Sequence, residues 1–333
     1  MNRWRHWLLP GVLVIEIALF TALSGQTFSS ATDAAIYFRS YFADLLAQSA
    51  PVLLLAFAMT LVLMTSGIDL SVGSSVALIA CVMSGFSAGP AFFWTAVPTG
   101  LALGLLLGAI NGAVIARLDV PPIIATLGTM ILYRGLCFVV MGDLEKSPFL
   151  GVPGYEALGQ FAGAATIVAV LFAAGGGWLN RSRWLQEVLT LGGNRVAARY
   201  AGIHVTRRTL EVYALTGLLA FLAALTFTAR NGSVSASSLT GLELQVIVAV
   251  VLGGTRVQGG GGSLAGTFYG VLIVAVMDEG LRGAARWGTE HLPFKISHLE
   301  YILLGVLLAG GVWLNTRAQV ESPRRTERTV DRP

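Results

Sequence analysis

The chain has 333 residues, of which 55% are hydrophobic and 12% are charged, and its mean hydropathy is +0.72. A soluble domain carries about 25% charged residues, so this composition excludes an ordinary soluble enzyme and indicates a membrane protein. The pI is near 9.3, but the basic residues lie in short segments between apolar runs, so we expect no nucleic-acid partner. Cys81 and Cys137 lie inside apolar runs without the spacing of a disulfide framework or a metal site, so we expect no metal and no cofactor.

Ten apolar runs approach the length of about 20 residues that a bilayer-crossing helix needs. The first run follows the basic start MNRWRHW and contains Glu16; we interpret it as an uncleaved span, with a cleaved signal peptide as the alternative. The predicted fold is therefore an all-α polytopic membrane protein with about ten transmembrane helices. The predicted spans are residues 8–23, 43–65, 70–86, 92–116, 122–141, 161–179, 210–228, 242–252, 264–281 and 299–314, of which 70–86 and 242–252 are short.

The distribution of basic residues predicts the orientation of these spans. With the N-terminus inside, 15 of the 22 Lys and Arg residues lie in cytoplasmic segments, six lie outside, and Arg134 lies within a span. Short loops rich in Lys and Arg are retained on the cytoplasmic side, so both termini are predicted to be cytoplasmic. The transmembrane domain would cover residues 1–315, and residues 316–333 are predicted to be a disordered cytoplasmic tail.

Residues 180–208 form a basic segment with six arginines. The segment separates two weakly similar apolar halves, about residues 1–180 and 209–315, and is predicted to be a cytoplasmic loop between them. This loop is the expected contact region for a soluble partner.

A short helix is predicted within this loop, because Asn194 can cap its start and Gly202 can end it. Arg195 and Arg199 are four residues apart and would share one face, where acidic residues of a partner could meet them. The alternative is a solvated loop that only sets the topology. The candidate docking residues are Asn194, Arg195, Ala198, Arg199 and Gly202.

Glycine and serine interrupt the apolar sequence at residues 67–74, which read GIDLSVGS. Non-helical backbone is tolerated in hydrocarbon only where protein or a water-filled cavity covers it, so this segment is predicted to face a solute path. The structural alternative is that Asp69 caps the helix that follows. The candidate path residues are Gly67, Asp69, Ser71, Gly73 and Ser74, together with Asn111 from the fourth span.

A second glycine-rich stretch, residues 253–262, follows the eighth predicted span. Two interpretations stay open for its glycines: a tight turn at the membrane surface, which Arg256 and Gln258 favour, and an interrupted span. The spacing of Gly67 and Gly73 equals that of Gly254 and Gly260, and the two stretches are six spans apart, which predicts a parallel repeat. The glycines concerned are Gly253, Gly254, Gly260 and Gly262.

Four motifs together resemble one known family. They are GIDLSVGS at 67–74, DVPPIIATLGTMILYRG at 119–135, GGNRVAARYAGIHVTR at 192–207 and VVLGGTRVQGGGGSLAGT at 250–267. In this order the chain is similar to the ribose-type permease family of bacterial ATP-binding-cassette importers. The resemblance covers about 200 residues and leaves out the first 40 residues and the tail.

The resemblance implies a pore subunit for a monosaccharide or a related small polar solute. It also implies a bacterial inner-membrane location in contact with lipid, a separate ATPase subunit, an extracytoplasmic solute-binding protein, and a second permease subunit that makes a homodimer or a heterodimer.

The residues themselves indicate that the energy for transport comes from another chain or from an ion gradient. A nucleotide-binding loop reads GxxxxGK[ST], and neither lysine of the chain, Lys146 nor Lys295, is preceded by glycine, so we expect no enzyme activity of its own. Two alternatives stay open. One is an ion-coupled secondary transporter that uses Glu16, Asp69 and Arg134, and the other is an amino-acid permease of the same superfamily.

Overall fold

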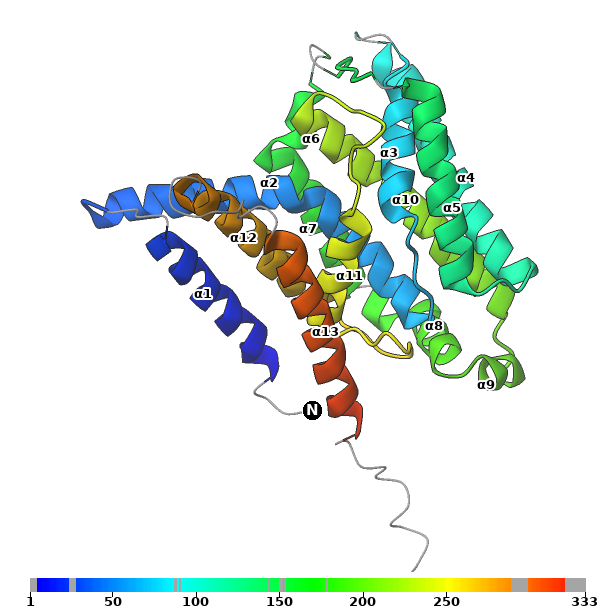
Figure 1. Cartoon of the computed structure of the whole chain (residues 1–333). Helices are drawn as coiled ribbons and strands as arrows, with labels where there is room; N and C mark the ends of the chain where they lie inside the picture. Colours follow the sequence, from blue (N-terminus) through cyan, green and yellow to red (C-terminus); the bar gives the residue numbers. More distant parts are fainter. Residues whose placement is uncertain are drawn as a thin grey trace, which may run out of the picture.

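The computed structural model describes residues 5–23, 28–86, 89, 91–142, 144–149, 152, 154–177, 179–288 and 299–320. These residues form a helical bundle (Figure 1), and each predicted span overlaps one of its α-helices. The helices are α1 (Arg5–Leu23), α2 (Ala31–Met64), α3 (Val72–Met83), α4 (Phe92–Arg117), α5 (Pro122–Met141), α6 (Glu156–Gly159), α7 (Phe161–Gly177), η1 (Leu179–Arg181), α8 (Arg183–Gly193), α9 (Arg195–Tyr200), α10 (Val205–Asn231), α11 (Leu242–Leu252), α12 (Leu264–Gly288) and α13 (Leu299–Val320).

Five helices are long and apolar enough to cross a membrane, namely α2, α4, α5, α10 and, over Leu264–Arg282, α12. Shorter apolar stretches lie in α1, α3, α7, α11 and α13. The chain is therefore an all-α polytopic membrane protein, as its composition predicted. α3 and α11 contain only 12 and 11 residues, which is about half the length of a bilayer-crossing helix.

The two short helices, α3 and α11, begin inside the bundle. A non-helical segment leads to the start of each. Residues 65–71 lead inward from the end of α2 to α3, and residues 232–241 lead inward from the end of α10 to α11 (Figure 1). The two segments enter from opposite ends of the bundle. Ser66 and Leu239, with φ of 63° and 61°, turn the chain within them.

The contacts between helices form a repeat of four helices, α2 to α5 and α10 to α13. α3 packs against α4, α5 and α10, and α11 packs correspondingly against α12, α13 and α2. Likewise α4 packs against α10, and α12 packs against α2. Since the corresponding non-helical segments run in opposite directions, the repeat is inverted, an arrangement found in many transporters. The predicted parallel repeat is wrong, because the counterpart of residues 65–71 is 232–241 and not the glycine-rich stretch.

The glycine-rich stretch forms the turn between α11 and α12. The amide of Gly260 donates to the carbonyl of Met64 at 3.1 Å, and a Cβ at Gly192 would lie 1.8 Å from the same carbonyl oxygen. Three chain segments therefore meet here in close backbone contact, which requires small residues. Of the two interpretations the turn is therefore the correct one, and its glycines include Gly253, Gly254, Gly260 and Gly262.

α5 holds both non-helical segments in place. The hydroxyl of Thr126 accepts from the amide of Leu70 at 3.1 Å and lies 3.0 Å from the carbonyl of Ile68. Two turns further along, Arg134 donates to the carbonyls of Ala236 and Ser238 at 2.7 and 2.8 Å. Backbone groups without a partner are costly in hydrocarbon, so these side chains stabilise the two segments.

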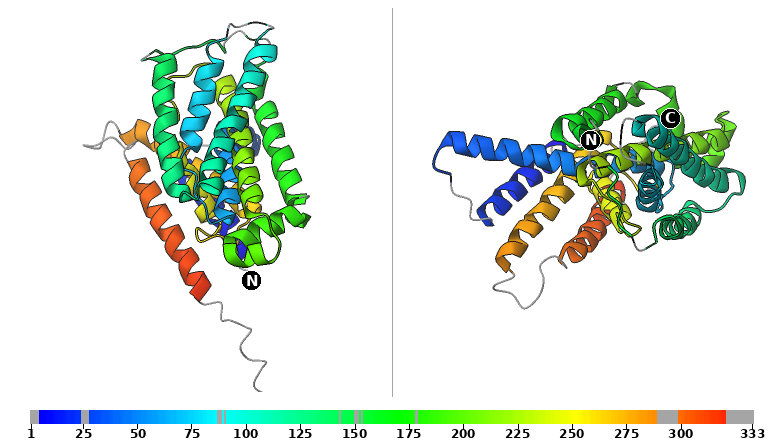
Figure 2. Two further views of the ribbon diagram at one scale, coloured as in Figure 1. Left: turned by 90° about the vertical axis from the view of Figure 1, so that its right-hand side faces the viewer. Right: turned by 90° about the horizontal axis from the view of Figure 1, so that it is seen from above.

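The two ends of the described chain lie at one end of the bundle. The start of α1 and the end of α13 point to the same end of the bundle as α9 (Figures 1 and 2). α13 continues to Val320, so residues 316–320 of the predicted disordered tail are helical. The rest of the predicted tail, residues 321–333, and the basic residues before Arg5 lie outside the described residues.

Candidate functional site

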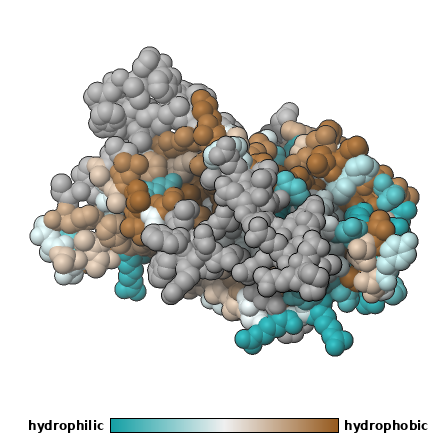
Figure 3. Space-filling view, turned by 90° about the horizontal axis from the view of Figure 1, so that it is seen from below, coloured by the Kyte–Doolittle hydropathy of each residue, from teal (hydrophilic) through white to brown (hydrophobic). Residues whose placement is uncertain are grey.

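α9 is a six-residue helix that is fixed at both ends. Oδ1 of Asn194 accepts hydrogen bonds from the amides of Val196 and Ala197 at 2.9 and 3.0 Å, so Asn194 is the N-cap. Gly202 follows with φ of 79°, the left-handed conformation that commonly ends a helix. Seen from this end of the molecule, hydrophilic side chains gather on the side where α8 and α9 lie (Figure 3).

The two faces of α9 differ in burial. Ala198 is fully buried against Leu191 and Val205. Val196 and Tyr200 point outward, with 63% and 90% of their surface exposed. Exposed apolar side chains of this size beside polar residues are typical of an interaction surface. Ala198 was predicted as a docking residue, but its small side chain instead anchors the helix to the bundle.

The two arginines of α9 also differ in exposure. Arg199 is exposed and Arg195 is half-buried. Within the described part of the chain neither forms an ion pair. Together with Val196 and Tyr200 they form what we call the α9 surface.

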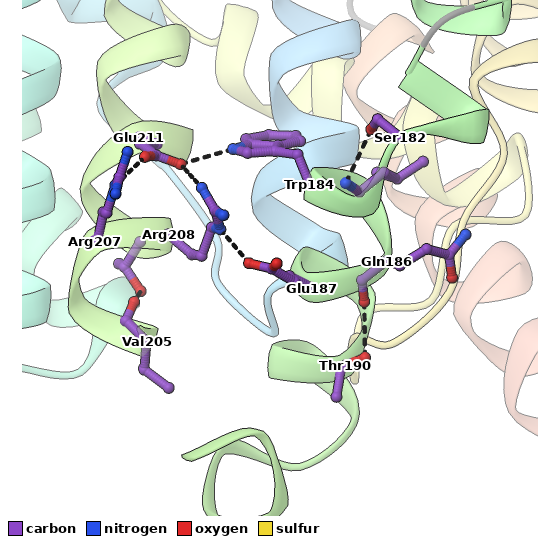
Figure 4. A network of polar contacts seen from close by, with 11 residues as sticks. Ser182, Trp184, Gln186, Glu187, Thr190, Val205, Arg207, Arg208 and Glu211 are labelled. Atoms are coloured by element: carbon purple, nitrogen blue, oxygen red, sulfur yellow. Dashed lines mark hydrogen bonds and ion pairs between the residues drawn. The ribbon is translucent and has the colours of Figure 1, made fainter. Parts of the chain in front are cut away.

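A polar network joins α8 to α10, the helices on either side of α9 (Figure 4). Arg208 donates to the carboxylates of Glu187 and Glu211, each at 2.5 Å. Glu211 also accepts from Nε1 of Trp184 at 2.7 Å and from Nε of Arg207 at 2.8 Å. Sequence reasoning counted the arginines of this segment and missed their acidic partners. The available signal was Glu211, four residues after Arg207 on a helix.

The first non-helical segment carries a buried polar cluster. Oδ1 of Asp69 accepts from the amide and the hydroxyl of Ser71 at 2.9 and 2.6 Å. Nδ2 of Asn111 donates to the Ser71 hydroxyl at 2.8 Å. All three side chains are at most 2% exposed. The Asp69 contact is a local turn of the kind that aspartate commonly forms two residues ahead of itself.

The other candidate path residues lie where the two half-length helices meet. The hydroxyl of Ser74 donates to the carbonyl of Ser71 at 2.9 Å. A Cβ at Gly73 would lie 2.6 Å from Oε2 of Glu243 and 3.0 Å from the carbonyl oxygen of Leu239. Gly73 and Glu243 are each the second residue of their helix, so the starts of α3 and α11 touch at corresponding positions of the repeat. Gly67 lies next to the hydroxyl of Tyr213.

A cavity of about 670 Å³ lies between α2, α10, α11 and α12. It is lined by both polar and apolar side chains, and none of the six candidate path residues contributes to it. Sequence reasoning missed this cavity, because its polar residues come from four helices that are far apart in the sequence. The adjacent polar residues Gln48 and Ser49 within the apolar sequence of α2 were the available signal.

Comparison with known proteins places the chain in a family. Residues 41–310 match a family model described as the permease component of branched-chain amino acid transport systems. The ribose import permease protein RbsC of Escherichia coli K12 is 37% identical over 306 residues, which cover 89% of this chain and 91% of that protein.

Two further relatives agree with this match. The fructose import permease protein FrcC of Rhizobium meliloti is 33% identical, with 89% of this chain and 81% of that protein covered. The autoinducer 2 import system permease protein LsrC of Klebsiella pneumoniae is 35% identical, with coverage of 89% and 84%. No solved structure matches the chain. The resemblance to ribose-type permeases, inferred from four motifs, is confirmed.

Proposed function

The chain belongs to the family of permease components of branched-chain amino acid transport systems, and we propose that it is the transmembrane pore subunit of an ATP-binding-cassette importer. The observation that carries the proposal is the similarity to proteins named import permeases over 89% of the chain. The inverted repeat with two half-length helices supports it, since such repeats are typical of transporters.

We infer that the solute is a monosaccharide or a related small polar molecule. The relatives named above are import permeases for ribose, fructose and autoinducer 2. An amino acid is the second candidate, because the family model is described by branched-chain amino acids. The motif GIDLSVGS favours the sugar.

Energy would come from a separate ATPase subunit, because the sequence contains no GxxxxGK[ST] loop. The α9 surface is the proposed contact for this subunit. Its exposed Tyr200 and Val196 offer apolar area, and Arg199 offers charge for acidic residues. The ion pairs of Arg208 with Glu187 and Glu211 would hold α8, which precedes α9, against α10.

The complete importer would lie in the inner membrane of a bacterium, with the α9 end in the cytoplasm. A solute-binding protein would deliver the solute at the opposite end, and a second permease subunit would complete the pore. We propose that the solute path is closed where Gly73 meets Glu243, at the starts of α3 and α11.

The α9 surface provides the test. The change R195E with R199E should reduce binding of the ATPase subunit at least tenfold, because it replaces attraction by repulsion. The matched control is R117E with R256E, which reverses two exposed charges outside α9. The measurement is co-purification of the ATPase with each variant from membranes. Equal loss of binding in both variants, or in neither, would contradict docking at α9.

A further inference from the structure

A second hollow of the molecule, which we call the α7 groove, runs along α7 at the edge of the bundle. α2 forms its floor, because α7 and α12 both pack against α2 and line the two sides. Leu53 of α2 is fully buried in this floor. Ala169 and Gly176 of α7 and Ala265 of α12 are exposed, so the groove is open to the surroundings. It shares no lining residue with the cavity between α2, α10, α11 and α12.

The wall of the α7 groove is apolar almost throughout. Phe172 and Phe268 line it from α7 and α12, with ring centroids 5.4 Å apart. Among the lining residues only Tyr269 has a side-chain group that forms hydrogen bonds. A polar solute would lose its hydrogen bonds to water in this groove without replacement. The wall therefore excludes a sugar or an amino acid and is suited to a hydrocarbon chain.

The dimensions of the groove distinguish a lipid chain from a helix of a partner protein. Along α7 the lining residues extend from Ala165 to Gly176, which at 1.5 Å per residue is about 16 Å. This length is about half of the hydrocarbon core of about 30 Å, so it corresponds to one leaflet. Dividing the volume of about 500 Å³ by this length gives a mean cross-section of about 30 Å². A helix about 10 Å in diameter needs about 80 Å², so only a narrower chain fits.

Positive charge lies just beyond the end of this groove. Gly176 is followed five residues later by Arg181 in η1 and then by Arg183, the first residue of α8. Both arginines are exposed, and within the described part of the chain neither forms an ion pair. Glu187, the next acidic residue along the chain, is already paired with Arg208. Basic side chains at the membrane surface attract anionic lipid headgroups.

We propose that the α7 groove binds an acyl chain of an anionic phospholipid from the leaflet on the side of α8 and α9, with Arg181 and Arg183 at its phosphate group. A zwitterionic lipid has the same phosphate but adds an ammonium group, which the arginines repel. The site goes beyond the proposed function, because this lipid is neither the solute nor part of its path.

The charge of the site is tested by lipid binding to the delipidated protein in detergent, measured by native mass spectrometry. The probes are dioleoyl-phosphatidylglycerol, which is anionic, and dioleoyl-phosphatidylcholine, which is zwitterionic. The unmodified protein should bind the anionic lipid about tenfold more tightly, and R181Q with R183Q should remove this preference. The matched control is R117Q with R199Q, which removes two exposed charges on α4 and α9, helices that do not line the groove.

The apolar part of the site is tested with two glycines of α7. Gly176 and Gly177 are both exposed, and an added Cβ at either meets no atom within 4 Å, but only Gly176 lines the groove. G176L should weaken binding of both lipids about tenfold, as expected when about two CH₂ groups leave the groove. G177L should bind both lipids like the unmodified protein. Size-exclusion chromatography checks that each variant is folded.

Several outcomes would overturn the lipid site while the importer function stands. One is equal affinity of the unmodified protein for the two lipids. Another is an equal effect in a variant and its matched control. Binding of sn-glycerol 3-phosphate, which has the phosphate without an acyl chain, that is lost in R181Q with R183Q would identify a plain anion site instead. Loss of a dimer in G176L with unchanged lipid binding would assign the groove to a second copy of the chain.

Discussion

At the scale of single residues, Arg134 shows how a charge is accommodated inside an apolar bundle. The sequence placed it within a span, where a charge relay was one alternative. In the structure it donates to the carbonyls of Ala236 and Ser238, which belong to a segment without helical hydrogen bonds. This arrangement explains the arginine as a donor for exposed backbone, so it needs no role in proton transfer.

The change R134Q should therefore destabilise the protein. Hydrogen bonds to charged groups contribute about 1.5 to 3 kcal/mol each, so we expect the free energy of unfolding to fall by about 3 kcal/mol, and R134K to retain part of it. The measurement is thermal unfolding of the purified protein in detergent. An unchanged melting temperature together with lost uptake would point to a transport role for the charge instead.

The buried carboxyl group of Asp69 gives a second prediction. The change D69N tests whether the charge of Asp69 matters, because Oδ1 accepts both hydrogen bonds from Ser71 and asparagine keeps this acceptor. We expect D69N to stay within about 1 kcal/mol of the parent stability and to transport. D69L, which leaves the two Ser71 donors without a partner, should lose about 3 kcal/mol. A folded D69N without uptake would show that the negative charge itself matters.

At the scale of helices, the tightest contact joins α4 to α10. Gly100, Gly104, Gly108 and Gly112 recur at every fourth position of α4. A Cβ at Gly104 would lie 2.6 Å from the carbonyl oxygen of Gly217, and one at Gly108 would lie 2.2 Å from that of Tyr213. Small residues at this spacing let two membrane helices approach closely.

The change G108L should prevent this contact and with it the folded state. The matched control is G128L on α5, where an added Cβ meets no atom within 4 Å. We expect G108L to lose the monodisperse peak in size-exclusion chromatography and G128L to keep it. Equal behaviour of the two variants would contradict a packing role for the α4 glycines.

The sequence predicted where the helices lie, but it did not predict which segments of the two halves correspond in the repeat. Long apolar runs determine where helices form, so all ten predicted spans lie on helices. The repeat was misread because the equal spacing of glycines in 67–73 and 254–260 is coincidental. The true counterpart, residues 232–241, is rich in serine and reads as an ordinary polar loop. Only the three-dimensional contacts of α3 and α11 reveal that it enters the bundle.

The candidate sites could likewise be predicted only where the signal is local in the sequence. The capped helix at Asn194 could be predicted, since a cap and a terminating glycine are local signals. That Ala198 faces inward could not, because a six-residue helix has too few positions to define its buried face. The cavity could not be predicted either, since Gln48 and Asn231 are far apart in sequence and only the packing of α2 against α10 brings them together.

At the scale of the whole molecule, the inverted repeat relates the helices α2 to α5 to the helices α10 to α13. α3 and α11 meet at Gly73 and Glu243, the α9 surface lies at one end, and the cavity adjoins the other. Arg208 joins α8, which precedes α9, to α10 through Glu187, and α10 borders both the cavity and α3. In the proposed importer, this arrangement would link ATP hydrolysis at the α9 end to solute movement through the bundle.

The most direct test of the importer function is the energy dependence of uptake. The chain is reconstituted in vesicles with its ATPase subunit and the solute-binding protein, and uptake of labelled D-ribose is measured with ATP, without ATP, and with an imposed proton or sodium gradient. Because the sequence contains no nucleotide-binding loop, we predict uptake only when the ATPase subunit and ATP are both present. Uptake driven by an ion gradient in the absence of ATP would contradict the importer function and favour a secondary transporter.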